Sequence, residues 1–149
     1  MTDTAQPDAV VFDFDGVVVD SERVHLACFQ QVLAVCGLEL TEEEYYGRYL
    51  GLSDRDCFRA VFDDRGRTPE PGQVAECTRR KTALVIDAYA TAVVPVPGSI
   101  ERIGELHAAG VPLAVCSGGL TAEIVAASRR LGVLDCFAAI VSADDVAEH

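Results

Sequence analysis

The spacing of apolar residues changes along the chain, and this change divides the chain into segments that predict strands and segments that predict helices. Residues 8–14 form a short apolar run rich in β-branched and aromatic residues, which predicts a buried strand. From residue 21 to 92 the apolar positions recur at helical spacing. Two later apolar runs, 111–116 and 138–141, alternate with helical segments. A strand, a helical insert and then helix–strand alternation predict an α/β core with a parallel sheet.

The helical stretch has recognisable starts and stops. A first helix begins at Asp20 or Ser21 and ends at Gly37, with an apolar face at Val24, Cys28, Val32 and Val35. Thr41 begins a second helix with Glu44 as its capping-box partner. Ser53 caps a third, whose apolar stripe is Cys57, Phe58, Val61 and Phe62. A long helix follows over 73–92, with Lys81 expected to lie along its edge by its aliphatic stem.

The return to the core is marked by two prolines and a glycine. Residues 93–98 are expected to form a stiff, extended linker. Beyond it, Ser99 and Thr121 are predicted to cap helices that end before Gly110 and Gly132. The sequence therefore predicts a core made of residues 1–20 and 96–149, with a helical insert over 21–95.

Two carboxylates close the first strand. Asp13 and Asp15 lie two residues apart, and in a strand such residues point the same way. Two like charges at the mouth of a core are costly unless a cation or a shared proton relieves them. This pattern favours a metal-assisted phosphoryl-transfer site over a strand that merely ends in an acidic turn. Ser117 closes the strand over 111–116, and such strand ends meet at one edge of a parallel sheet.

Composition narrows the classes of function. The net charge of −12 disfavours nucleic acid and anionic lipid as partners. No apolar run has membrane-spanning length, and residues 1–8 do not resemble a secretory signal, so a cytoplasmic protein is expected. Most of the six cysteines stand among apolar helical or strand residues, which indicates small buried side chains. A disulfide framework is not expected in a cytoplasmic chain of this size, and without a C-x-x-C pair the ligand spacing of a zinc site is absent.

The motifs resemble those of the haloacid dehalogenase superfamily. Its first motif, D-x-D-G-x-x-x-D, is matched by residues 13–20, and the strand ending in Ser117 matches its second. The pattern from Phe12 through Ser21-Glu22 to His25 is similar to that of β-phosphoglucomutase-like phosphatases. The resemblance implies a Rossmann-like core, with the insert over 21–95 as a helical cap domain.

The resemblance also implies a mechanism. Asp13 would be the nucleophile that forms an aspartyl phosphate with a small phosphate ester, and Asp15 the general acid and base. Mg²⁺ would be held by the Asp13 carboxylate and the Asp15 backbone carbonyl. Gly16 would shape the turn that brings backbone N–H groups to the phosphate. Ser117 and the Gly118 amide would bind the transferring group.

Two further residues are candidates for substrate contacts. His25 falls where related enzymes place a histidine near the cap–core hinge, and a packed structural histidine is an equal alternative. Arg55 would reach a substrate anion from a cap loop, or be an ordinary surface arginine. Asp15 argues against a dehalogenase, which lacks an acid there. Leu50 stands where the mutase pattern has a lysine, which favours a phosphatase over a sugar-phosphate mutase.

The family's later motifs, a lysine and the acids that complete the magnesium site, are not found before His149. Lys81 is expected to be unable to replace that lysine, and Asp144 and Asp145 are interpreted as loop acids. The sequence therefore predicts a truncated hydrolase that is marginally folded alone or pairs through its exposed first strand. An inactive fragment that binds phosphate or a partner, and a fragment complemented by a separate C-terminal piece, are alternatives.

Overall fold

A computed structural model describes residues 7–146 of the chain. The chain forms two compact units, one made of Met1–Ser21 and Tyr89–His149 and the other of Glu22–Ala88. The elements follow the order β1 (Val10–Phe12), α1 (Glu22–Val35), α2 (Glu42–Glu44), η1 (Tyr45–Tyr49), α3 (Asp54–Asp64), α4 (Gln73–Thr91), α5 (Ser99–Ala108), β2 (Leu113–Cys116), α6 (Thr121–Leu131), η2 (Leu134–Cys136), β3 (Ala139–Val141) and η3 (Ala143–Asp145). Among the described residues, no helix is both long and apolar enough to cross a membrane.

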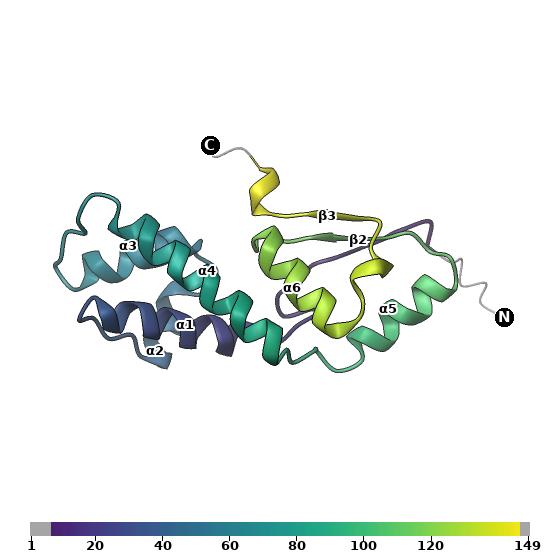
Figure 1. The fold of residues 1–149 in the computed structure, drawn as a ribbon, viewed down its shortest axis with the longest axis horizontal. Coiled ribbons are helices and arrows are strands. Elements are labelled where there is room, and N and C mark those ends of the chain that lie inside the picture. The colour runs from purple at the N-terminus through teal and green to yellow at the C-terminus, as the bar shows by residue number, and fades with distance from the viewer. Residues whose placement is uncertain (1–6, 147–149) are drawn as a thin grey trace. The chain divides into compact units, whose positions relative to one another are not determined.

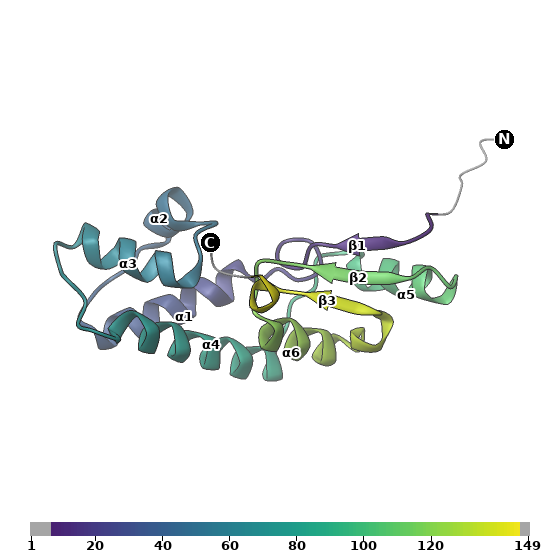
Figure 2. The same ribbon diagram turned by 90° about the horizontal axis from the view of Figure 1, so that it is seen from above.

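The first unit is built on a parallel three-stranded sheet in the order β1-β2-β3 (Figure 2). Its register pairs Phe12 with Val115 and Val115 with Ile140. Helices α5 and α6 both lie against one face of this sheet (Figure 1). The α/β fold with a parallel, Rossmann-like sheet is thus confirmed. The strands are shorter than the apolar runs that predict them, because ladder pairing covers only Val10–Phe12, Leu113–Cys116 and Ala139–Val141.

Apolar side chains from distant parts of the sequence fill the core of this unit. Leu113 and Val115 of β2 are buried, as are Ile103 of α5 and Ile124 of α6. Burying such side chains contributes roughly 1.5–3 kcal/mol each. This core fixes where the strands end, and therefore where the polar residues that follow them lie.

Two extended segments run side by side at the edge of the first unit, where the chain leaves it and returns. The Asp20 N–H donates to the Val94 carbonyl (2.8 Å), and the Val96 N–H donates to the Val18 carbonyl (3.0 Å). The expected extended linker over 93–98 is therefore paired with the last residues of the first motif. The predicted domain limits at residues 20 and 96 stay a prediction.

The second unit is helical and has its own apolar core. Phe29, Phe58 and Phe62 are buried in it, and the rings of Phe29 and Phe58 lie 4.9 Å apart in an edge-to-face arrangement. The stripe predicted for α3 is correct, since all four of its members are buried. The face predicted for α1 is wrong at Val35, which is 73% exposed, because Leu26, Phe29 and Leu33 define the buried side instead.

Two predicted helix caps are also wrong. Gly98, with φ of 82°, precedes α5, and Ser99 lies inside the helix with its hydroxyl donating to the Val18 carbonyl (2.9 Å). Leu120 precedes α6, and the Thr121 hydroxyl pairs with that of Ser142 (2.6 Å). Each hydroxyl has a partner from elsewhere in the unit, which competes with capping.

Candidate active site

The two carboxylates of the first motif follow directly after β1. Asp13 is exposed and Asp15 is half-buried, while Phe14 between them is buried in the core. The Phe14 N–H donates to the Asp13 carboxylate at 2.7 Å, which restrains that side chain at the strand end. Successive side chains along an extended segment point to opposite sides. Phe14 is therefore buried, while Asp13 and Asp15 lie at the surface of the first unit.

Ser117 meets Asp15 from the neighbouring strand. Because β1 and β2 are parallel and in register, their carboxyl ends lie at one edge of the sheet. The Ser117 hydroxyl lies 3.4 Å from the Asp15 carboxylate, a long hydrogen bond, and accepts the Gly119 N–H at 3.1 Å. The structure thus brings together Asp15 and Ser117, which are 102 residues apart in sequence.

Gly119 is a close neighbour of this pair that the sequence analysis did not single out. A Cβ at this position would lie 3.2 Å from the Asp15 carboxylate and 3.4 Å from the Ser117 hydroxyl. A side chain here would crowd both groups, so the glycine leaves room for them. The Gly118-Gly119 pair directly after a strand was the signal that could have identified it.

The segment after β3 holds the Ser117 loop in place. The Ala143 N–H donates to the Gly119 carbonyl (3.0 Å), and the Asp144 carboxylate accepts the Thr121 N–H at the start of α6 (2.9 Å). Asp145 accepts the Ser142 N–H (2.9 Å) in a capping box. Both acids therefore make hydrogen bonds within the first unit, where they position a loop.

Gly16 makes the turn after the carboxylates possible. Its φ of 73° lies in the left-handed region, which residues with a Cβ atom rarely adopt. Its N–H donates to the Val19 carbonyl at 2.8 Å, and the Phe14 carbonyl accepts from Val18 at 2.8 Å. The Gly16 N–H is therefore hydrogen-bonded within the turn. Gly16 shapes the loop that follows the two carboxylates.

His25 belongs to a polar cluster around the buried Lys81 in the helical unit. Its Nδ1 lies 2.6 Å from the ammonium nitrogen of Lys81, which also pairs with the Asp54 carboxylate at 2.8 Å. An ammonium group has only hydrogens to donate, so Nδ1 accepts while Lys81 is charged. The expected edge position of Lys81 is wrong, because its side chain is only 1% exposed. Arg55, next to Asp54, is exposed.

The cluster was not anticipated, although one signal was present. Lys81 is the only lysine among twelve basic residues, and it stands in the apolar stripe of a long helix. A charge at such a position is buried only where partners compensate it, and Asp54 and His25 lie far away in sequence. The structure describes His25, Asp54 and Lys81 within the helical unit, and Asp13, Asp15 and Ser117 within the other.

The donor set at the end of β1 fits a hard, oxygen-seeking cation. Asp13 and Asp15 offer carboxylate and backbone oxygens, which Mg²⁺ prefers. Within residues 7–146, no three histidine, cysteine or acidic side chains gather as a metal site. Mg²⁺ is commonly held by one or two carboxylates together with water and a substrate phosphate, and the oxygens of Asp13 and Asp15 are of the kind that such a site uses.

Comparison with known proteins identifies relatives of the chain. Residues 10–149 match the family model of haloacid dehalogenase-like hydrolases. The chain is 26% identical over 146 residues to protein CbbY of Rhodobacter capsulatus, covering 94% of this chain and 64% of that protein. It is 30% identical over 142 residues to the phosphoglycolate phosphatase of Mesorhizobium japonicum, covering 93% and 61%.

A solved structure shows the same fold. CbbY from Rhodobacter sphaeroides, crystallised with phosphate, superposes with a TM-score of 0.84 at 26% identity, covering 96% of this chain and 66% of that one. The chain spans less than two thirds of the length of these relatives. The family match extends over nearly the whole chain, so the chain belongs to the haloacid dehalogenase-like hydrolase family.

Proposed function

We propose that the chain carries the nucleophile and phosphate-binding loops of a Mg²⁺-dependent phosphatase of small organic phosphates. The observation that carries this proposal is the meeting of Asp15 with Ser117 at the end of two parallel strands, directly beside Asp13. A nucleophile, an acid and a hydroxyl donor are the groups that phosphoryl transfer needs at one place. Relatives named as phosphatases support the same reaction class.

In this proposal Asp13 attacks the phosphorus atom. A bond forms between its carboxylate oxygen and phosphorus, and the bond from phosphorus to the ester oxygen breaks. Asp15, in its neutral form, gives its proton to the leaving alcohol oxygen. It then takes a proton from the water that hydrolyses the aspartyl phosphate, which releases inorganic phosphate and regenerates Asp13.

The remaining groups orient the phosphoryl group. The Ser117 hydroxyl and the Gly118 N–H would donate hydrogen bonds to its oxygens, and Gly16 shapes the turn beside it. Asp13, together with the Asp15 backbone carbonyl, would hold Mg²⁺, whose charge lessens the repulsion between a carboxylate and a phosphate. His25 and Arg55 are proposed to contact the rest of the substrate from the helical unit, acting as a cap.

The test is hydrolysis of an aryl phosphate by the 149-residue chain. We expect turnover that needs Mg²⁺, a loss of more than about 10³-fold in Asp13→Asn, and a loss of about 10²–10⁴-fold in Asp15→Asn. Asp135→Asn is the matched control, an exposed aspartate in the same unit, and is expected to keep full activity.

Three results would count against the proposal. If Asp13→Asn keeps turnover, Asp13 is not the nucleophile. Turnover that a chelator leaves unchanged would remove the metal. A chain that neither turns over nor gains melting temperature with inorganic phosphate and Mg²⁺ would favour an inactive or complementing fragment. The mutase alternative is tested by supplying a sugar phosphate and measuring isomer formation against phosphate release.

A further inference from the structure

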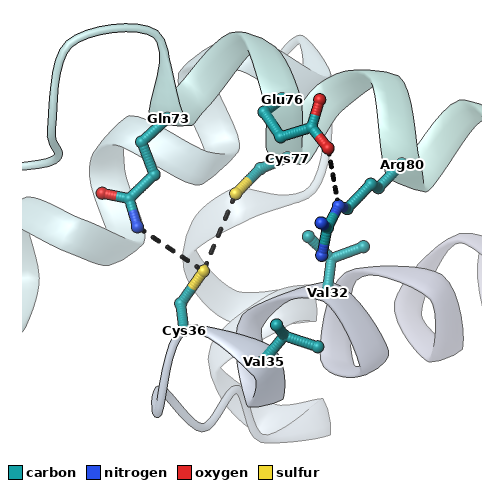
Figure 3. A pocket seen from close by; sticks show the side chains of 7 residues that line it. All are labelled: Val32, Val35, Cys36, Gln73, Glu76, Cys77 and Arg80. Atoms are coloured by element: carbon teal, nitrogen blue, oxygen red, sulfur yellow. Dashed lines mark hydrogen bonds and ion pairs between the residues drawn. The ribbon is translucent and has the colours of Figure 1, made fainter.

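Two cysteine sulfur atoms face each other inside the helical unit. Cys36 follows the last residue of α1, and Cys77 lies in the second turn of α4, 41 residues further along the chain. Their Sγ atoms are 3.8 Å apart and point toward one another (Figure 3). A disulfide has an S–S distance of about 2.05 Å, so each pair member has to move by roughly 1 Å to form one.

The surroundings leave room for that movement. A pocket of about 220 Å³ lies beside the two sulfur atoms, lined also by Val32, Val35 and Arg80 (Figure 3). On the same measure, a cavity needs only about 10–15 Å³ to hold one water molecule. Cys36 is half-buried and Cys77 is buried, so a small oxidant that enters the pocket meets Cys36 first.

The pair is better suited to a disulfide than to a metal. A metal site needs further ligands, and no group of three metal-binding side chains exists among residues 7–146. Glu76, the nearest acid in the pocket, is engaged by Arg79 (2.8 Å) and Arg80 (2.7 Å). A disulfide needs only the two sulfur atoms that are already in contact.

We propose that Cys36 and Cys77 form a reversible disulfide, which ties the end of α1 to the first half of α4. This modification site is independent of the phosphatase proposal, because neither cysteine belongs to that machinery. The oxidant would be a small peroxide or a low-molecular-weight disulfide that enters the pocket.

The two sulfur atoms would play different parts. Burial, together with the hydrogen bond to the Cys36 sulfur, raises the pKa of the Cys77 thiol to about 11, so it stays protonated at neutral pH. Cys36 is the more exposed of the two sulfur atoms, and it receives a weak hydrogen bond from the Gln73 side-chain amide (3.8 Å). Cys36 is therefore the attacking sulfur and Cys77 the resolving one.

Hydrogen peroxide would oxidise the two cysteines in two steps. The Cys36 thiolate attacks one peroxide oxygen, the O–O bond breaks, and the departing hydroxide takes up a proton, leaving Cys36 as a sulfenic acid. The Cys77 sulfur then attacks the Cys36 sulfur, the S–O bond breaks, and water leaves with the Cys77 proton. Two thiols are oxidised by two electrons, and one peroxide is reduced to two waters.

The experiment is peptide mapping of the 149-residue chain without reduction, after treatment with hydrogen peroxide. We expect a cross-linked peptide that joins Cys36 to Cys77 and disappears with dithiothreitol. The same treatment in denaturant is the control, because an unfolded chain with six cysteines gives mixed pairings. Native oxidised protein in which both cysteines are still alkylated, or in which Cys36 pairs elsewhere, would overturn the proposal.

Two variants separate the parts of the two cysteines. Cys77→Ala should leave Cys36 as a sulfenic acid that a dimedone probe labels, with complete loss of the cross-link. Cys116→Ala, which removes an exposed cysteine of the other unit, should form the cross-link as the wild type does. A cross-linked Cys36 in Cys77→Ala, or loss of the Cys36–Cys77 cross-link in Cys116→Ala, would contradict the assignment.

Discussion

A single buried cation forms the polar centre of the helical unit. The Lys81 ammonium nitrogen contacts Asp54 and His25 and lies 5.1 Å from the centre of the Phe29 ring. Removing an ammonium group from water costs free energy unless polar partners replace its hydration. Here the Asp54 carboxylate compensates the charge of Lys81. The carboxylate is itself 24% exposed, so it keeps part of its own hydration.

Asp54→Asn should therefore destabilise the helical unit more than an ordinary surface change. Removing one partner of a buried pair leaves the other charge uncompensated, and we expect a loss of about 3 kcal/mol in the free energy of unfolding, measured with urea. Adding Lys81→Met should recover part of this loss, because it removes the stranded charge. Asp63→Asn, exposed on the same helix, is the control and should change stability by less than about 0.5 kcal/mol. Equal losses in the two aspartate variants would disprove this account.

The sequence predicted those site residues whose position is set by the end of a strand. Asp13, Asp15 and Ser117 follow apolar runs, and parallel pairing brings such positions to one edge of a sheet. The burial of Lys81 and the close approach of Gly119 to Asp15 depend on contacts between segments far apart in the sequence. A lysine in an apolar stripe and a glycine pair after a strand mark these positions in the sequence, but the sequence pattern does not identify their partners.

At the scale of elements, capping determines where several helices begin. Thr41 and Glu44 form a reciprocal capping box, in which the Thr41 N–H donates to Glu44 at 3.0 Å and the Glu44 N–H donates to Thr41 at 3.1 Å. Arg65, from the end of α3, adds an ion pair to Glu44 at 2.7 Å. One carboxylate thus fixes the start of α2 and links it to a second helix.

Glu44→Gln should weaken the fold at neutral pH but not in acid. The hydrogen bond from the Thr41 backbone, and then the Arg65 side chain, hold the pKa of Glu44 below its usual value of 4.5. A lowered pKa contributes stability above pH 4.5, and this contribution is lost as the pH falls through the lower folded-state value. The melting temperatures of wild type and Glu44→Gln, measured from pH 7 downward, should therefore converge in acid.

Glu43→Gln is the matched control for this experiment. It changes a neighbouring exposed acid and leaves the capping box intact. Its melting temperature should follow that of the wild type across the same range. A difference between wild type and Glu44→Gln that stays constant from pH 7 into acid would show that the Glu44 charge has no part in stability.

Helix starts were predicted where the capping residue has no competing partner. Thr41 and Ser53 accept N–H groups from Glu44 and Asp56, as their spacing indicates. Ser99 and Thr121 have the same residue types, but their hydroxyls bond to Val18 and Ser142 instead. The competing groups come from other segments, so the spacing alone could not distinguish the two cases.

Among the described elements, helices cover only one of the two faces of the sheet (Figure 1). Parallel sheets usually have helices on both faces, because both carry apolar side chains. Here Val11 of β1 is 64% exposed and Val141 of β3 is 44% exposed. β1 is also an edge strand, whose unpaired backbone groups can template another strand.

We therefore propose that the 149-residue chain self-associates through β1 and the open face of its sheet. Light scattering should show a mass that rises with concentration, and Val11→Lys should lower it, because a charge on an edge strand opposes pairing. Val35→Lys is the control, since Val35 is equally apolar and 73% exposed but belongs to the helical unit. A wild type that stays monomeric at high concentration, or an equal effect of both substitutions, would contradict the proposal.

The paired segments at residues 18–20 and 94–96 bear on how proteins of this kind change over evolutionary time. Their hydrogen bonds hold the segment just before the chain leaves the first unit, after Ser21, against a segment that follows its return at Tyr89. An insert whose two ends are clamped together adds little constraint to its host, whatever its length. The intervening helices are free to be lengthened, shortened or exchanged, while the sheet and its carboxylates stay in place. Under the proposed function, changes in the helical insert would alter the substrate contacts proposed for His25 and Arg55 and leave the sheet that carries Asp13 and Asp15 unchanged.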